Sequence, residues 1–355
     1  MSPFTPKCLP LLIGSLPLDS HQEATDLIFQ YTPDIPLWPQ LPIYKREGMM
    51  QQFLPGLPGV TELDGKTFID ASSAACEEEM LAFYEEYLSI TEGATPLDAS
   101  RFQLAREAAP GFYTFLEQAR AKKATLTALK GQTTGPVTFC IGLVDQDGRA
   151  IFYNDQLRDA AIKHLAMKAR CQVRTMAEIC NRTIMFFDEP GLAGLGSSTF
   201  ITITREDIIA CLSEVFDGVR AENGLTGVHV CANTEWSLVF ESGVDIVSYD
   251  AYSFFDKLIL YPEHLVKFFA GGGILASGII PTTPEFIDAE TTDSLVAKWF
   301  RQTEQLQAIG IDRAKVYAQT LITPSCGTGA VSREQAVKVL HLTKSVAEKI
   351  RASFL

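Results

Sequence analysis

From residue 124 to the end of the chain, strand-like segments alternate regularly with helix-like segments. The expected strands are short apolar runs, at residues 125–132, 183–190, 227–233, 244–252, 272–280 and 315–327. The expected helices lie at residues 158–180, 205–223, 234–242, 262–271, 292–310 and 332–354. Such alternation predicts parallel strands joined by helical crossovers, and therefore an α/β fold.

The count of strands and the chain length favour a closed barrel. "LLIGSL" at 11–16 adds a seventh strand, and an eighth is expected around residues 41–70. A chain of 355 residues suits one (β/α)8 TIM barrel with extensions. No glycine-rich dinucleotide fingerprint follows a strand, which counts against a doubly wound open sheet. We therefore expect a single barrel domain over residues 1–355, with an N-terminal extension and a helical insertion.

Residues 17–122 are the expected elaboration of that barrel. Their first part is rich in proline and turn residues, as in "YTPDIPLWPQLP", and indicates an extended loop region. Their second part shows apolar residues at three- and four-residue spacing, which predicts helices at residues 76–90 and 112–124.

Composition and charge exclude several classes of protein. The chain is 46% hydrophobic and 21% charged, so it can bury a large core, and its net charge of −13 argues against nucleic-acid binding. No apolar run approaches the roughly 20 residues of a membrane helix. The first 20 residues are interpreted as leading into a strand and not as a signal peptide. Eight scattered cysteines favour reduced thiols in a cytoplasmic protein.

Polar residues follow most of the expected strands at their carboxyl ends. They are Gly14-Ser15, Gln132 to Pro136, Asp188-Glu189-Pro190, His229-Val230-Cys231, Asp250, Ser277-Gly278 and Ser325-Cys326-Gly327. In (β/α)8 barrels the chemistry lies at these ends, which converge on one rim. The barrel prediction therefore makes these sequence-distant groups neighbours.

"HVC" and "SCG" carry the residues best suited to a metal. His229 and Cys231 are two positions apart on an expected strand, so their side chains point to one side, although a buried strand end contains such pairs without any metal. Cys326 ends the last expected strand and supplies a second sulfur. One nitrogen and two sulfurs are ligands that zinc prefers, and a catalytic zinc keeps one position open. Asp250, at the end of the following strand, is a candidate fourth and displaceable ligand.

Five motifs in order resemble the superfamily of uroporphyrinogen decarboxylase and cobalamin-independent methionine synthase, and most closely the catalytic C-terminal barrel of the synthases. The motifs are "LLIGSLP", "TGPVT", "MFFDEPGL", "HVC" and "SCG". They are spread over nearly the whole chain. Together they are specific for the superfamily, whereas each alone is weak.

The resemblance implies a zinc-dependent transfer of a methyl group to homocysteine, giving methionine. It implies His229, Cys231 and Cys326 as zinc ligands and catalytic residues. For the substrate it implies Ile13, Gly14 and Ser15 in "IGS" at the amino-acid part, and Asp188 in "DEP" at the amino group. Glu47 in "YKREGMM" corresponds more loosely to a second acidic contact.

The chain departs from the common synthases in three respects. It has one barrel where they have two, and Asp250 stands where their fourth zinc ligand is a glutamate. "LASGIIPT" at 275–282 lacks the histidine that serves them as general acid. Methyl transfer from methyltetrahydrofolate expels a basic nitrogen that needs a proton, whereas cob(I)alamin leaves without one. The missing acid therefore favours methylcobalamin, delivered by a partner corrinoid protein, as donor. His264 and His341 are in helical patterns and are expected at the surface.

Other readings of the same residues stay open. "HVCANT" and "GVDIVSYD" also resemble methyltransferases that use coenzyme M as acceptor. A metal-free porphyrinogen decarboxylase is a third reading, although the strand ends lack the arginines that its substrate needs. A non-enzymatic corrinoid- or metal-binding protein is a fourth. The aromatic residues Tyr44, Trp236, Tyr252 and Phe254 either line a donor site or serve packing.

Overall fold

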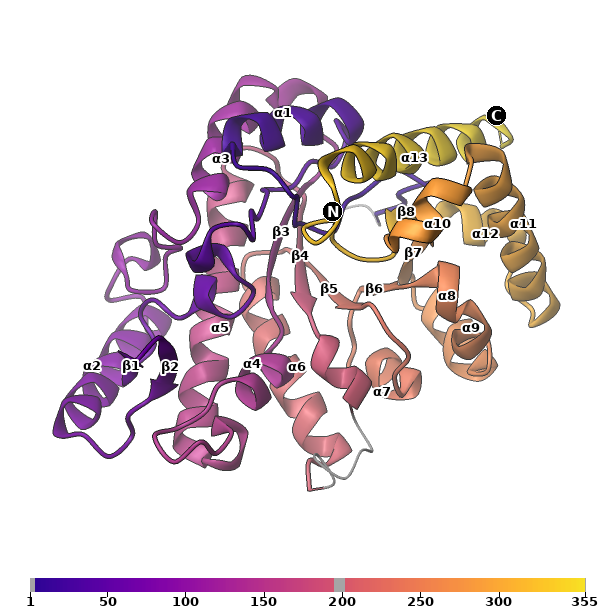
Figure 1. Cartoon of the computed structure of the whole chain (residues 1–355). Helices are drawn as coiled ribbons and strands as arrows, with labels where there is room; N and C mark the ends of the chain where they lie inside the picture. The colour runs from indigo at the N-terminus through magenta and orange to yellow at the C-terminus, as the bar shows by residue number, and fades with distance from the viewer. Residues whose placement is uncertain (1–3, 195–201, 355) are drawn as a thin grey trace.

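A curled parallel sheet forms the centre of the molecule. The computed structural model describes residues 4–194 and 202–354. Six strands follow one another in the order β3-β4-β5-β6-β7-β8 (Figure 1). Their bounds are β3 Leu129–Thr134, β4 Thr183–Asp188, β5 Leu225–Val230, β6 Ile246–Tyr249, β7 Ile274–Ile280 and β8 Thr320–Pro324. Nearly every strand residue is buried, as expected for a parallel sheet with both faces covered.

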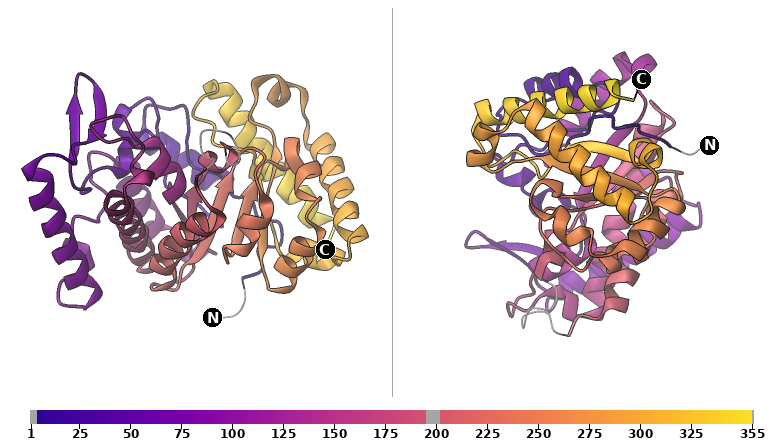
Figure 2. Two further views of the ribbon diagram at one scale, coloured as in Figure 1. Left: turned by 90° about the horizontal axis from the view of Figure 1, so that it is seen from below. Right: turned by 90° about the vertical axis from the view of Figure 1, so that its right-hand side faces the viewer.

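Helices surround the sheet on the outside (Figures 1 and 2). The α-helices are α1 His21–Tyr31, α2 Ala74–Thr91, α3 Pro110–Ala121, α4 Pro136–Gly142, α5 Asp155–Ala177, α6 Arg205–Arg220, α7 Trp236–Glu241, α8 Ala251–Leu258, α9 Pro262–Ala270, α10 Pro284–Ala289, α11 Thr292–Ala308, α12 Arg313–Ala318 and α13 Arg333–Ala352. Short 3₁₀ helices are η1 Lys45–Glu47, η2 Gln51–Phe53, η3 Leu97–Ala99, η4 Lys123–Thr125, η5 Ile151–Tyr153 and η6 Pro190–Gly194. Within the described residues, none of the helices has the length and apolar character needed to cross a membrane.

Two irregular segments link the outer strands of the sheet. Leu11 N donates to Ile322 O of β8 (2.9 Å), and Lys130 N of β3 donates to Pro36 O (3.1 Å). Between them, Gln40 N donates to Gly14 O (3.1 Å). The chain before α1 therefore lies beside β8, and the chain after α1 lies beside β3.

The expected strands at 11–16 and 41–70 are wrong as stated. The first segment forms only an isolated bridge, Ser15 with Gln40, and the second bridged segment precedes residue 41. Pro10, Pro36 and Pro39 have no N–H, so they interrupt a continuous ladder. The six strands are therefore supplemented by bridged segments and not by two further strands.

Residues 60–69 form a separate antiparallel hairpin and not a barrel strand. It consists of β1 Val60–Leu63 and β2 Lys66–Ile69. The hairpin and α2 lie together at one side of the molecule (Figures 1 and 2). The expected elaboration at 17–122 thus contains this hairpin and the helices α1 to α3.

Two expected strands are too long at their ends. The segment 244–252 turns into helix α8 at Ala251, and the segment 315–327 begins inside α12. The strand within 244–252 ends before Asp250, because the Asp250 side chain caps α8 by accepting from Ser253 N at 2.8 Å. The helices expected in the insertion and in the alternating half are present, with bounds shifted by a few residues.

The inside of the curled sheet changes from apolar to polar along its strands. An apolar cluster fills the end where the strands begin, with Leu11, Ile184, Phe186, Ile246 and Leu321 among its members. The next inward position on β4 after Ile184 and Phe186 is Asp188, because side chains on one face recur every second residue. Polar groups therefore gather at the carboxyl ends, where barrel enzymes place their chemistry.

Candidate metal and thiol site

Three polar side chains lie side by side on adjacent strands, near the carboxyl ends of those strands. Asp188 of β4 is the register partner of His229 of β5, and His229 is the partner of Ser248 of β6. Paired residues of parallel strands share a face of the sheet, so all three point the same way. This row places the "DEP" and "HVC" motifs together, as the sequence predicts.

His229 has one ring nitrogen fixed and one free. The residue is buried, and its Nδ1 lies 2.9 Å from Ser248 Oγ. Its Nε2 is shielded from solvent and has no hydrogen-bond partner. An Nδ1–H that donates to Ser248 leaves a lone pair on Nε2, which is the arrangement of a histidine metal ligand.

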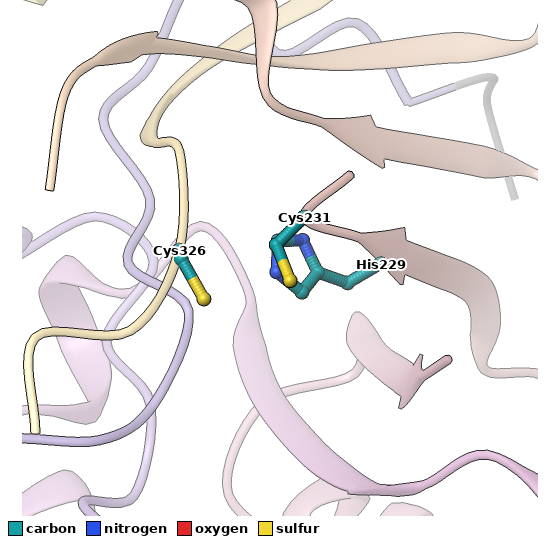
Figure 3. A group of neighbouring side chains, drawn as sticks. All are labelled: His229, Cys231 and Cys326. Carbon is teal, nitrogen blue, oxygen red and sulfur yellow. The ribbon is translucent and has the colours of Figure 1, made fainter. Parts of the chain in front are cut away.

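Cys231 and Cys326 complete a group with His229. Cys231 follows the end of β5, and Cys326 lies in the loop after β8. A ring nitrogen and the two sulfurs all lie within 4.8 Å of one another. Figure 3 shows the side chains converging from the two elements. The nitrogen and two sulfurs fit zinc, and the free Nε2 is an unmatched atom that such an ion satisfies.

The two thiols share their protons unequally. The nearby Cys326 thiol, and after it the His229 ring, lower the pKa of Cys231 to about 4. The same contact with Cys231, together with burial, raises the pKa of Cys326. The two thiols together therefore lose one proton readily. A cation bound by both sulfurs would favour loss of the second proton.

Ser248→Ala is expected to weaken zinc binding without removing it. Groups that hold the second nitrogen of a histidine ligand typically contribute about 10- to 100-fold to metal affinity. Loss of the Ser248 hydroxyl frees the His229 ring to rotate and to change tautomer. A competition titration with a chromophoric chelator measures the dissociation constant.

Ser242→Ala is the matched control for Ser248→Ala. Ser242 is also buried, and its Oγ donates to Val239 O (2.7 Å) at the end of α7. Both variants lose one hydroxyl bond, which costs about 1 kcal/mol of stability. Equal zinc affinity in the two variants would show that Ser248 does not support the metal group.

Asp250 lies outside the group of three ligand atoms. Its Oδ1 accepts from Ser253 N, and burial raises the pKa of its carboxyl, an effect opposed by the bond from Ser253. Cys231 is near enough to add to the rise. Asp250 as a fourth ligand therefore stays a prediction, and its observed role is to cap α8.

The Ile13–Ser15 segment contacts the loop that carries Cys326. Thr328 N donates to Ser15 O at 2.9 Å, and Gly329 N donates to Ser15 Oγ at 3.2 Å. Among the described residues, the backbone N–H groups of Gly14 and Ser15 have no hydrogen-bond acceptor. Two adjacent free N–H groups can bind a carboxylate. The structure thus brings the "IGS" and "SCG" motifs together.

Asp188 presents an unpaired carboxylate oxygen in the same row as His229. Its Oδ1 is shielded from solvent and accepts no hydrogen bond. Burial raises the pKa of the carboxyl, while His229 and Lys130 act to lower it. An unsatisfied buried acceptor of this kind suits an ammonium group, which is the predicted role of Asp188.

Glu47 is buried and has partners for both oxygens. Oε1 lies 2.7 Å from His21 Nε2, and Oε2 accepts from Leu41 N at 3.0 Å. The His21 ring stacks on Tyr44, with the centroids 5.6 Å apart. These contacts organise the loop after α1, and a substrate contact of Glu47 stays a prediction.

The remaining candidate side chains have ordinary surroundings. His264 pairs with Glu241 on the outside, and His341 is exposed on α13, so both are surface residues as expected. Trp236 packs edge-on against Tyr249. Tyr252 OH donates to Glu290 Oε1, and Phe254 is half-buried. A donor site formed by these aromatic residues stays a prediction.

Glu189 has a role that the sequence prediction missed. Its Oε1 accepts from Val137 N (2.9 Å), and its Oε2 accepts from Thr138 N (2.8 Å) and Thr138 Oγ1 (2.6 Å). Burial raises its pKa to about 7, and the bonds from Thr138 and Val137 oppose the rise. Glu189 thereby ties "TGPVT" at the start of α4 to the end of β4. The neighbouring "TGPVT" and "DEP" motifs were the available signal for this contact.

Lys130 was also missed, although it is fully buried on β3. A lysine on a fully buried strand is unusual, because buried lysines are rare without a specific partner. Its Nζ donates to Ile13 O (2.5 Å) and lies 3.3 Å from Gln132 Oε1. Lysine in "TALKGQTT" was the signal for a functional group on the inner face of the curled sheet.

Comparison with known proteins supports the fold more than the activity. No protein-family model matches the chain, and no curated protein matches its sequence. A solved methyltransferase from Methanosarcina mazei is similar over 97% of this chain and 94% of its own, with a TM-score of 0.55 and 15% identity. That likeness shows a common fold.

A B12-independent methionine synthase from Shewanella sp. W3-18-1, solved with selenomethionine, is similar over 68% of this chain and 67% of its own. The TM-score is 0.48 and the identity 21%. A likeness this low carries no argument about the site.

Proposed function

We propose that this chain is a zinc-dependent methyltransferase whose acceptor is a thiol, with homocysteine converted to methionine. The free Nε2 of His229, grouped with the sulfurs of Cys231 and Cys326, carries this proposal. The Methanosarcina mazei protein that shares the fold is described as a methyltransferase, which agrees with it.

The residues of the site have separate tasks in this proposal. His229, Cys231 and Cys326 hold the zinc, which when bound lowers the pKa of a thiol so that the sulfur reacts as thiolate. Asp188 Oδ1 receives the ammonium of the substrate. The N–H groups of Gly14 and Ser15 receive its carboxylate. These contacts would hold the acceptor with its sulfur near the group of His229, Cys231 and Cys326.

A methylated corrinoid, carried by a partner protein, is the proposed donor. No histidine occurs between Ile274 and Thr283, and Thr282 Oγ1 instead lies 2.9 Å from Ser325 Oγ. The surface positions of His264 and His341 do not supply the missing acid. A donor whose leaving group needs no proton fits these residues better than methyltetrahydrofolate.

A donor and acceptor panel tests this function. Purified zinc-loaded protein is incubated with L-homocysteine and either methylcobalamin or methyltetrahydrofolate, and methionine is measured. Methionine from methylcobalamin is expected. Turnover with methyltetrahydrofolate alone would refute the corrinoid donor. Coenzyme M is the second acceptor in the panel, and a preference for it would refute homocysteine, because coenzyme M has no ammonium group to pair with Asp188.

A further inference from the structure

Lys130 is a buried cation for which packing gives no reason. Its side chain is fully buried, and among the described residues no carboxylate oxygen lies within ion-pair distance of its Nζ. Removing an ammonium group from water costs several kcal/mol, whereas a methionine fills similar space at no such cost. Because burying the Lys130 ammonium lowers stability in this way, we expect the residue to have a specific role.

The contacts of Lys130 are directed at one peptide group. Nζ donates to Ile13 O at 2.5 Å, and Gln132 Oε1 lies 3.3 Å away. The face of the Phe186 ring lies beneath it, with the centroid 4.5 Å from Nζ. Burial lowers its pKa to about 7, and the nearby carboxylate of Asp188 opposes this change. Nζ is therefore bonded to the Ile13 carbonyl, and the Asp188 carboxylate is near enough to raise its pKa.

The Ile13 carbonyl belongs to the same peptide unit as the Gly14 N–H. A peptide is planar and trans, so its C=O and N–H point in opposite directions. A cation bonded to the oxygen fixes that plane and polarises the unit, which makes the N–H a stronger donor. The N–H groups of Ile13, Gly14 and Ser15 all have no acceptor among the described residues, and that of Gly14 belongs to the peptide that Lys130 binds.

Glycine at position 14 agrees with a tightly held peptide. A Cβ there would lie 2.8 Å from Gln40 Oε1 and 3.3 Å from Gln132 Nε2. Gln132 also contacts Lys130, so the same side chain borders the segment and the cation. Thr328 N holds the other end of the segment through Ser15 O. The segment is thus fixed between the barrel interior and the Cys326 loop.

We propose that Lys130 is a positioning residue for the carboxylate of the acceptor. It acts through the Ile13–Gly14 peptide, whose N–H, with that of Ser15, binds the substrate anion. The inference rests on the proposed thiol methyltransferase function and adds a residue that positions its acceptor. Asp188 pairs with the ammonium, and Lys130 orients the peptide that binds the carboxylate.

Three thiols separate the two roles in a binding experiment. They are L-homocysteine, 3-aminopropane-1-thiol, which lacks the carboxylate, and 4-mercaptobutanoate, which lacks the ammonium. Affinities for the zinc-loaded protein are measured by calorimetry, and KM and kcat are measured with methylcobalamin. Lys130→Met is expected to weaken binding of L-homocysteine and 4-mercaptobutanoate about 10- to 100-fold, the effect of a bond to a charged group. Binding of 3-aminopropane-1-thiol should change less than about two-fold.

Lys168→Met is the matched control. Lys168 is the other fully buried lysine of the described residues, and its Nζ donates to Gln103 O (3.0 Å), which is not part of the site segment. The Lys168→Met variant should leave the ratio of the affinities for the three thiols unchanged. Lys130→Gln, which keeps a polar group in the interior, serves as the milder variant if Lys130→Met does not fold. It should shift the ratio in the same direction.

The outcomes distinguish the two proposals. If the unmodified protein binds no zinc or none of the thiols, the proposed function falls and the role of Lys130 falls with it. If it binds them and the Lys130 variants lower all three affinities equally, or none, the role of Lys130 is refuted while the function stands. A rise in KM for L-homocysteine with little change in kcat supports the positioning role.

Discussion

Cys326→Ser and Cys231→Ser are each expected to abolish stoichiometric zinc binding and methyl transfer together. Each removes one of the two sulfurs within 4.8 Å of the His229 ring nitrogen. A hydroxyl is a much poorer zinc ligand than a thiolate. The loss of affinity should exceed the about 100-fold that loss of an outer partner costs, because a direct ligand is removed. Metal analysis after gel filtration measures it.

Cys180→Ser provides the control for both cysteine variants. Cys180 has a similar intermediate exposure but lies outside the group of three ligand atoms. It should retain zinc at the level of the unmodified protein. Stoichiometric zinc retained in both Cys231→Ser and Cys326→Ser would rule out the site.

Asp188→Asn is expected to raise KM for L-homocysteine by about 30-fold or more, since truncating one partner of a buried charge pair costs about 2 kcal/mol or more. Asparagine has nearly the same shape, so the row with His229 should persist. Its amide has no charge and keeps only one of the two acceptor oxygens, the other being replaced by a donor NH2. Steady-state kinetics over a range of L-homocysteine concentrations measure the change.

The substrate 4-mercaptobutanoate is the control for Asp188→Asn. It carries the thiol and the carboxylate but no ammonium, so its KM should be nearly the same in both proteins. Zinc content should also stay constant, because Asp188 is not one of the three ligands. Equal losses for the two substrates would contradict an ammonium contact at Asp188.

The alternating half of the fold was predictable because its signals are local. A helix such as α6 begins with a capping box from Thr204 and Asp207, and its apolar residues recur on one face. Strand β4 is a continuous apolar run ended by a charged pair. The segments that link the outer strands were less predictable. Prolines interrupt them by removing ladder donors, and their bridges join residues hundreds of positions apart, such as Pro10 with Ile322.

The metal group was predictable from two rules together. Side chains in a strand alternate between its two faces, so His229 and Cys231 lie on the same face. The carboxyl ends of parallel strands meet at one rim, which brings Cys326 close to them. The supporting residues were not predictable by these rules. Ser248 faces His229 only through the register of β5 with β6, and register between distant segments is not readable from one sequence.

Asp250 shows how a residue type misleads when its local role is hidden. A carboxylate at a strand end suits both a metal and a helix N-terminus. Here the chain turns directly into α8, so the nearest unsatisfied groups are backbone N–H donors. The Ser253 N–H therefore binds its Oδ1, although Cys231 is close enough to affect its pKa.

The site draws on both ends of the chain, since Ser15 precedes the first helix and Cys326 follows the last strand. The three proposed ligands become neighbours only after β8 has joined the sheet. If the protein binds zinc as proposed, metal retention would therefore report that this part of the fold has formed. A chain that stops before Cys326 would leave His229 and Cys231 as an incomplete chelate, and zinc capture would mark the point at which the protein has assembled.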